Sequence, residues 1–193
     1  AGIYLRACRA VWNTCIREGF LKDVPYPFSN KKEKGLVSIP PSAKRRKCYL
    51  RVCQMTELYN LFISKQYPEH WGESYTASVH FSLGLFLVQY LCNGFNMADA
   101  ARLKYDNYYF QNEGKAFRFN RKKTEKTSAN GSEVIIPIIE PLQRILDEIA
   151  APPTRDGYVF PQIFNGAETE EDRRERTQQE NKNVRERMDN VCH

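Results

Sequence analysis

The chain has 193 residues, 41% of them hydrophobic, which suits a globular protein with one sizeable core, or one domain and a piece of another. Its 29 lysines and arginines exceed its 23 aspartates and glutamates, and the net charge of +6 fits a nucleic-acid partner but also many proteins that bind none. The apolar run at residues 79–91 is too short and too polar to cross a bilayer, which argues against a membrane protein.

The first predicted element is a helix over residues 2–19, because apolar residues recur at helical spacing on one of its sides. The opposite side carries Arg6, Arg9 and Arg17. Such a row is most often a solvated helix face, but arginines at this spacing also suit contacts to DNA phosphates. The three arginines are therefore candidate DNA-binding residues.

Residues 25–47 are expected to form a linker, since they contain four prolines and two basic runs but no long apolar period. The segment 36–39 is a candidate short strand within it. The second basic run is a candidate phosphate track, with a solvated tether as the alternative: Lys44, Arg45, Arg46 and Lys47. The predicted parts are thus residues 1–24, the linker 25–47 and a compact part over 48–193.

The compact part is predicted to be mainly α-helical, with a small antiparallel sheet of three strands. Apolar spacing and turn residues predict helices over 55–65, 74–92, 97–103 and 141–150. Strands are predicted at 108–110, 116–121 and 133–138. The charged stretch 168–190 is expected to be a loop followed by a helix that serves mainly to keep the protein soluble.

No two of the six cysteines form a C-x-x-C pair: Cys8, Cys15, Cys48, Cys53, Cys92 and Cys192. We therefore expect reduced thiols in a cytosolic protein, rather than a disulfide framework or a zinc site. The sequence predicts no metal and no cofactor.

The second predicted strand leads into Arg121-Lys122-Lys123-Thr124, and a polar segment with Lys126 follows. Cations at the tip of a hairpin can reach into a polyanion, although taken alone they would more often contact solvent. Together with residues 90–104 before it and 158–161 after it, this stretch resembles the catalytic domain of tyrosine recombinases, the phage-integrase family. The resemblance covers roughly residues 3–164 and is closest to integrases of mobile elements in Bacteroides-type bacteria.

The resemblance implies DNA binding and site-specific recombination, in which a tyrosine oxygen attacks a DNA phosphate and a 5′ hydroxyl leaves, without metal or cofactor. It implies that residues 1–24 hold the last helix of a core-binding (SAM-like) domain. Residues 48–193 would then be the N-terminal part of the catalytic domain. The implied partners are double-stranded DNA and further copies of the protein in a tetrameric synapse, and the implied location is the bacterial cytoplasm, at the nucleoid.

Lys123 matches the lysine of the family's R-x-K-T turn, and the resemblance makes it the acid that protonates the leaving hydroxyl. A lysine suits this role because it is a compact charge on a long stem whose pKa falls near other cations. Arg121, Lys122 and Lys126 would contact DNA, and the two lysines among them are the alternatives for the acid.

The family's first catalytic arginine is replaced in this chain. In the frame Gly94-Phe95-Asn96, asparagine stands at the arginine position, and Asp99 stands at the family's acidic position. Asparagine can donate a hydrogen bond but brings no charge, and some Bacteroides-type relatives also lack this arginine. Arg102 is a candidate substitute, with surface solvation as the alternative.

The family's H-x-x-R box and its tyrosine nucleophile have no counterpart in the sequence. We therefore expect a fragment of a longer integrase, which cannot itself cleave DNA although its full-length parent would be an enzyme. One alternative is a non-catalytic DNA-binding module derived from a recombinase. Another is a helical protein-interaction domain whose basic charge is incidental.

Overall fold

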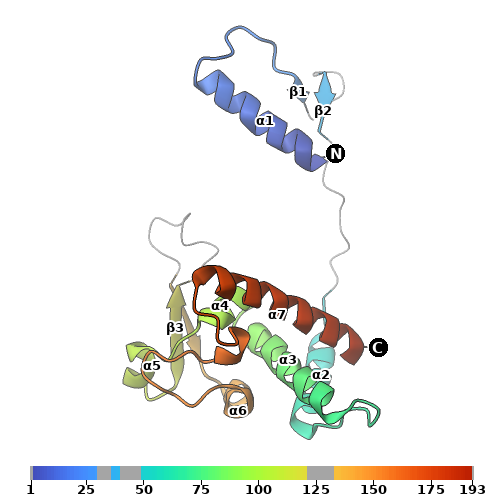
Figure 1. Cartoon of the computed structure of the whole chain (residues 1–193), viewed down its shortest axis with the longest axis vertical. Coiled ribbons are helices and arrows are strands. Elements are labelled where there is room, and N and C mark those ends of the chain that lie inside the picture. The colour runs from blue at the N-terminus through green and yellow to red at the C-terminus, as the bar shows by residue number, and fades with distance from the viewer. Residues whose placement is uncertain (1, 30–35, 40–48, 121–132, 193) are drawn as a thin grey trace. The chain divides into compact units, whose positions relative to one another are not determined.

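A computed structural model describes residues 2–29, 36–39, 49–120 and 133–192. The chain divides into two compact units, Ala1–Tyr49 and Leu50–His193 (Figure 1). Helices dominate both, and none within the described ranges is long and apolar enough to cross a membrane.

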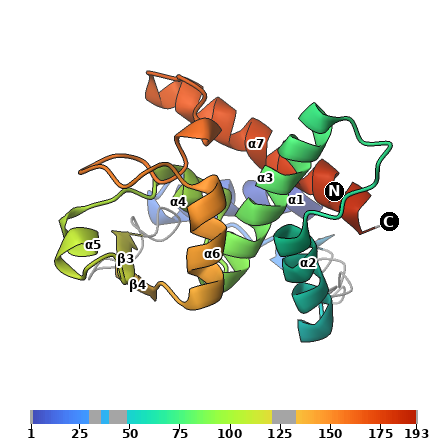
Figure 2. The ribbon, with the colours of Figure 1, turned by 90° about the horizontal axis from the view of Figure 1, so that it is seen from below.

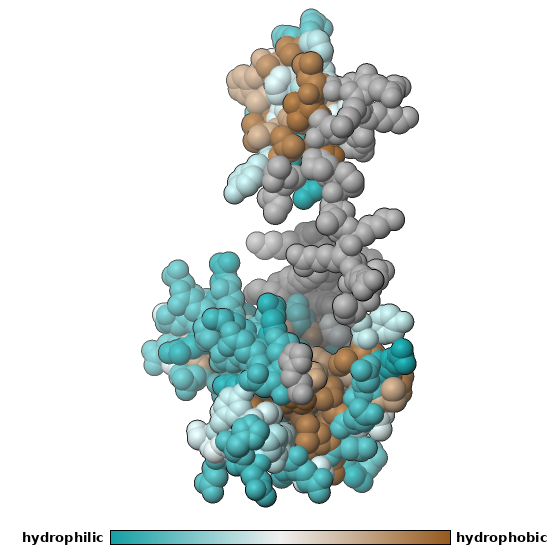
Figure 3. Space-filling model, turned by 90° about the vertical axis from the view of Figure 1, so that its right-hand side faces the viewer, coloured by the Kyte–Doolittle hydropathy of each residue, from teal (hydrophilic) through white to brown (hydrophobic). Residues whose placement is uncertain are grey.

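The first unit contains α1 (Gly2–Arg17) and two short parallel strands, β1 (Phe28–Ser29) and β2 (Val37–Ser38). The strand predicted at 36–39 is therefore present, and it pairs within the segment predicted to be a linker. The Trp12 ring of α1 packs edge-on against Phe28, with ring centroids 6.2 Å apart. Large apolar side chains of this unit remain exposed, including Tyr4 and Val11, and apolar residues gather on the face that Figure 3 shows.

The second unit holds the remaining elements: α2 (Val52–Ser64), α3 (Glu73–Leu91), α4 (Met97–Arg102), α5 (Asn107–Gln111), β3 (Ala116–Asn120), β4 (Glu133–Pro137), α6 (Glu140–Ile149), the 3-10 helix η1 (Pro161–Ile163) and α7 (Glu170–Val191). The four helices predicted in this region are confirmed as α2, α3, α4 and α6, with small shifts at their ends.

Helix α3 is the centre of this unit, packed by α2, α6 and α7 (Figures 1 and 2). Its sequence is apolar nearly all round, which is typical of a helix buried on several sides. Gly84 allows α2 and α6 to lie close against α3, since a Cβ there would lie 2.7 Å from Ile149 of α6 and 3.0 Å from the Phe62 ring of α2. The lack of a side chain at Gly84 thus lets three helices meet.

The small sheet has two antiparallel strands in the described ranges, so the prediction of three is wrong. Residues 108–110 form part of α5 instead of a strand. Their aromatic composition favours a strand, but the Asp106 side chain accepts a hydrogen bond from the Tyr109 N–H at 3.0 Å and caps the helix. The other two predicted strands pair as β3 and β4, with Ala116 opposite Pro137 and Asn120 opposite Glu133.

Helix α7 lies across α3 and α4 and is more than a solubilising helix (Figure 1). It buries Thr177, Val184 and Met188 along one side. Its Arg187 guanidinium donates a hydrogen bond to the Ser82 hydroxyl of α3 at 2.9 Å. A few buried side chains and the hydrogen bond from Arg187 therefore hold this highly charged helix against the core.

Candidate nucleic-acid interface

Several residues predicted to meet DNA lie outside the described ranges, so the structure gives no geometry for them: Lys44, Arg45, Arg46, Lys47, Arg121, Lys122, Lys123 and Lys126. The structure does describe the residues on either side of the segment that holds Arg121, Lys122, Lys123 and Lys126. The chain leaves β3 at Asn120 and returns to β4 at Glu133, and these two residues are paired neighbours. The four cations from 121 to 126 are therefore covalently tethered to this end of the hairpin.

The arginines predicted on the first helix lie on α1. Arg6 and Arg17 are exposed and Arg9 is half-buried. None of the three forms an ion pair within the described part of the chain, and Arg17 makes only a long hydrogen bond of 3.5 Å to the Thr14 hydroxyl. Their charges are thus available to a partner.

Asn96 is the N-cap of α4. Its side-chain oxygen accepts a hydrogen bond from the Asp99 N–H at 3.0 Å, and the Asp99 carboxylate accepts one from the Asn96 N–H at 3.1 Å. This reciprocal arrangement satisfies two of the free N–H groups at the helix start. Because an arginine side chain has no acceptor, it could not form this cap. Asn96 therefore has a structural role in this chain, as the cap of α4.

The turn before α4 is held against the hairpin. The Phe95 and Phe119 rings pack with centroids 5.6 Å apart, and Phe119 lies next to the last residue of β3. This contact brings the start of α4 close to the strand that leads to residues 121–126.

Replacing Asn96 with alanine is expected to destabilise the second unit by about 0.5–2 kcal/mol, because the first turn of α4 loses its cap. Urea denaturation followed by circular dichroism measures the change. Asn96→Ser is the control, since serine is an equally good N-cap and adds no charge beside the buried Asp99 carboxylate, and it should remain close to wild type. Equal losses in the two variants would contradict the capping role.

Three cations that line a cavity of about 210 Å³ beside this turn were not singled out together from sequence: Arg102, Lys104 and Arg118. Arg102 pairs with Glu170 of α7 at 3.1 Å. Arg118 lies 3.7 Å from Asp106 and 3.6 Å from Glu133. The Lys104 ammonium sits over the Tyr158 ring, 4.6 Å from its centroid.

These pairs can exchange partners. Glu170 and Glu133 are 69% and 54% exposed, so their ion pairs with Arg102 and Arg118 are well solvated and weak. A phosphate group, like a carboxylate, offers a guanidinium two oxygens for bidentate hydrogen bonding. Asp99 and Asp106 also line this cavity, so its three cations face two carboxylates, and the balance favours an anion only slightly.

Charge is divided unequally between the two units. The first 49 residues carry eleven lysines and arginines against three aspartates and glutamates, a net +8, which leaves −2 for the other 144 residues. Long-range attraction to a polyanion must therefore come mainly from the first unit and from the cations at 121–126.

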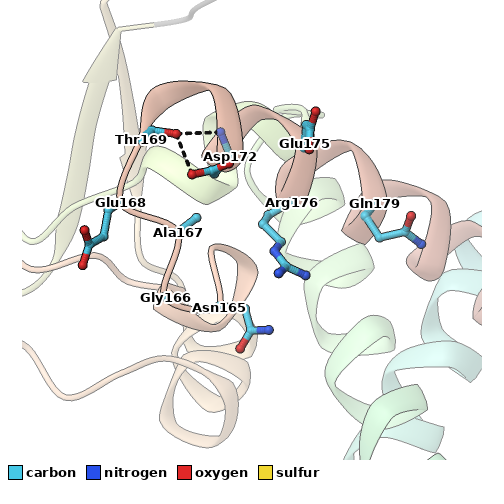
Figure 4. Close-up of a pocket in the computed structure, with 9 residues that line it drawn as sticks. All are labelled: Asn165, Gly166, Ala167, Glu168, Thr169, Asp172, Glu175, Arg176 and Gln179. Carbon is cyan, nitrogen blue, oxygen red and sulfur yellow. Dashed lines mark hydrogen bonds between the residues drawn. The ribbon is translucent and has the colours of Figure 1, made fainter.

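A second cavity, of about 620 Å³, lies between the segment 165–169 and the first turns of α7 (Figure 4). Arg176 extends from α7 toward the segment that holds Asn165, while Thr169 and Asp172 bond to each other across the helix cap. Three carboxylates, including Asp172, line this cavity against the single cation of Arg176. This balance does not suit a phosphate backbone.

Within the described ranges, no three His, Cys, Asp or Glu side chains are grouped closely enough to hold a metal ion. Comparison with known protein families, with curated proteins and with solved structures found no match for this chain.

Proposed function

We propose that this chain binds double-stranded DNA and forms part of a tyrosine recombinase that cuts and rejoins DNA through a tyrosine–phosphate intermediate. The observation that carries the proposal is the hairpin base, where Arg102 of α4 and Arg118 of β3 line one cavity next to the strand ends that tether Lys123. Strand transfer of this kind needs positive charge at the phosphate and an acid at the leaving oxygen. The two groups of cations provide candidates for both needs.

In this proposal each part of the chain has its own task. The first unit and the cations at 121–126 attract and hold the duplex, and Lys123 protonates the leaving 5′ hydroxyl. Arg102 or Arg118 supplies the phosphate contact that Asn96, engaged in the helix cap, does not supply. Copies of the protein assemble on the DNA, and the protein works in the bacterial cytoplasm at the nucleoid.

A second candidate is a non-catalytic DNA-binding module. The use of Asn96 as a helix cap favours it, since the charge expected at that position in the family is missing. The two candidates share DNA binding and differ in whether Lys123 takes part in a chemical step.

Replacing Lys44, Arg45, Arg46 and Lys47 together with alanine tests DNA binding. If each of the four contacts a phosphate, the slope of log affinity against log salt concentration should become shallower by about three to four units. Fluorescence anisotropy with a labelled duplex measures this slope. The loss of affinity should be similar for unrelated sequences, because phosphate contacts carry no base information.

The matched control removes the same charge from the second unit, by alanine at Arg144, Arg155, Lys182 and Arg185, all of which are exposed. It should change the slope by less than about one unit, because these cations lie in the part of the chain with net negative charge. Equal slopes in both variants, or no binding by the wild type even at low salt, would rule out the proposed phosphate track.

A further inference from the structure

A groove of about 570 Å³ lies where the chain turns from α2 into α3, with one residue of α6 at its edge. Its lining includes the aromatic residues Tyr67 and Trp71 and the carboxylates of Glu69 and Glu73. The groove shares no residue with the candidate nucleic-acid interface. A ligand bound in it therefore does not depend on the proposed DNA function.

A chain of hydrogen bonds holds one wall of this groove. The Tyr67 hydroxyl lies 2.8 Å from His80 Nδ1, and His80 Nε2 lies 3.0 Å from the Glu148 carboxylate. The Lys65 ammonium lies 2.8 Å from the same carboxylate. Four side chains from α3, α6 and the segment after α2 are thus joined in one network.

The protonation states in this network follow from their surroundings. Burial, and then the nearby Glu148, raises the pKa of Tyr67 to about 12, so its hydroxyl keeps its proton at neutral pH. Burial also acts to raise the pKa of Glu148, but hydrogen bonds from Lys65 and His80 outweigh it and leave that pKa below its usual value. Because an ionised carboxylate can only accept, the Nε2–H of His80 donates to Glu148.

Aromatic packing makes the wall rigid. The His80 ring stacks on Phe62 with centroids 4.2 Å apart and planes 9° apart. Trp71 stacks on Tyr67 at 6.1 Å and meets Tyr75 edge-on at 5.4 Å. Trp71 is half-buried, and side chains of this type, fixed before binding, often contribute most to a protein interface.

The rim is negatively charged. Glu69 and Glu73 are exposed, and neither forms an ion pair within the described residues. Lys65 also lines the groove, but its ammonium group is already paired with the Glu148 carboxylate. A groove with aromatic faces and free carboxylates attracts a cationic side chain and repels a nucleic acid.

We propose that this groove binds a segment of a partner protein through an arginine or lysine side chain. The guanidinium or ammonium group lies over the Trp71 and Tyr67 rings, and Glu69 and Glu73 contact its charge. The network from Tyr67 to Lys65 holds the rings in the binding arrangement, so that less side-chain freedom is lost on binding.

The test is a titration of the full chain with N-acetyl-arginine N-methylamide, followed through the indole N–H resonance of Trp71. The chain has two tryptophans, and a Trp12→Phe background assigns the signal. We expect a saturable shift in the millimolar range. The citrulline analogue has the same shape without charge and should bind about ten-fold more weakly.

Two variants complete the test. The double variant Glu69→Gln/Glu73→Gln should weaken arginine binding several-fold, whereas Glu57→Gln/Glu171→Gln, which changes two exposed carboxylates elsewhere, should not. Any one of three results would overturn the proposal: no shift of the Trp71 resonance, equal affinity for the arginine and citrulline compounds, or equal effects of the two double variants.

Discussion

Phe62→Ala is expected to destabilise the second unit by about 3–5 kcal/mol. The Phe62 side chain is fully buried and fills the space beside Gly84, where α2 approaches α3. It also stacks on His80, so its loss leaves a cavity and frees the ring at the centre of the hydrogen-bonded network. Urea denaturation followed by circular dichroism gives the free energy of unfolding.

Val52→Ala is the control, because Val52 lies on the same helix but is 74% exposed. It should cost less than about 0.5 kcal/mol, as is usual for exposed positions. A loss of under about 1 kcal/mol for Phe62→Ala would mean that α2 does not pack on α3 through this ring.

Lys123→Ala is expected to slow DNA cleavage by about 10²–10⁴-fold and to leave DNA affinity nearly unchanged, in an integrase chain that also carries a tyrosine nucleophile. The expectation rests on the position of Lys123 in the sequence Arg121-Lys122-Lys123-Thr124, which follows β3 directly. Single-turnover cleavage of a suicide substrate at saturating protein measures the chemical step. Lys122→Ala should instead weaken binding and leave that step nearly intact.

A substrate with a 5′-thiol leaving group distinguishes an acid from a phosphate contact. A thiolate leaves without being protonated, so this substrate should restore most of the rate lost in Lys123→Ala. If thiol and oxygen substrates are slowed equally, Lys123 is not the acid. If cleavage is unaffected by the variant, Lys123 takes no part in the chemical step. If the wild-type chain with the nucleophile does not cleave DNA, the non-catalytic module is the better account.

Much of the helical framework could be predicted because its signals are local. The apolar run of α3 and the regular stripe of α6, with Pro141 in its first turn, are visible over a few turns of sequence. Helix α7 carries too few apolar residues for such a stripe to stand out. Its buried positions become evident only when α3 supplies the opposing surface. At residues 108–110, three aromatic residues favour a strand, but the cap provided by the Asp106 carboxylate stabilises the helix α5 instead.

The candidate site divides in the same way. Asn96 could be found from its place in a short motif, but its use as a cap depended on the local backbone. Lys104 and Arg118 gave no signal, since their surroundings come from segments far apart in the chain. The pair between Arg102 and Glu170, and likewise the contact between His80 and Glu148, each join residues 68 positions apart. Local patterns in one sequence cannot predict contacts between residues this far apart.

The thiol of Cys92, at the end of α3, is buried, so its reactivity can be used to measure local unfolding around it. Burial raises the pKa of Cys92 to about 12, so almost none of the reactive thiolate exists at neutral pH. Cys8, Cys53 and Cys192 are exposed and should be alkylated at once. Because the thiol is buried, Cys92 reacts only when the structure around it opens, so the rate of its slow labelling reports the free energy of that local opening under native conditions.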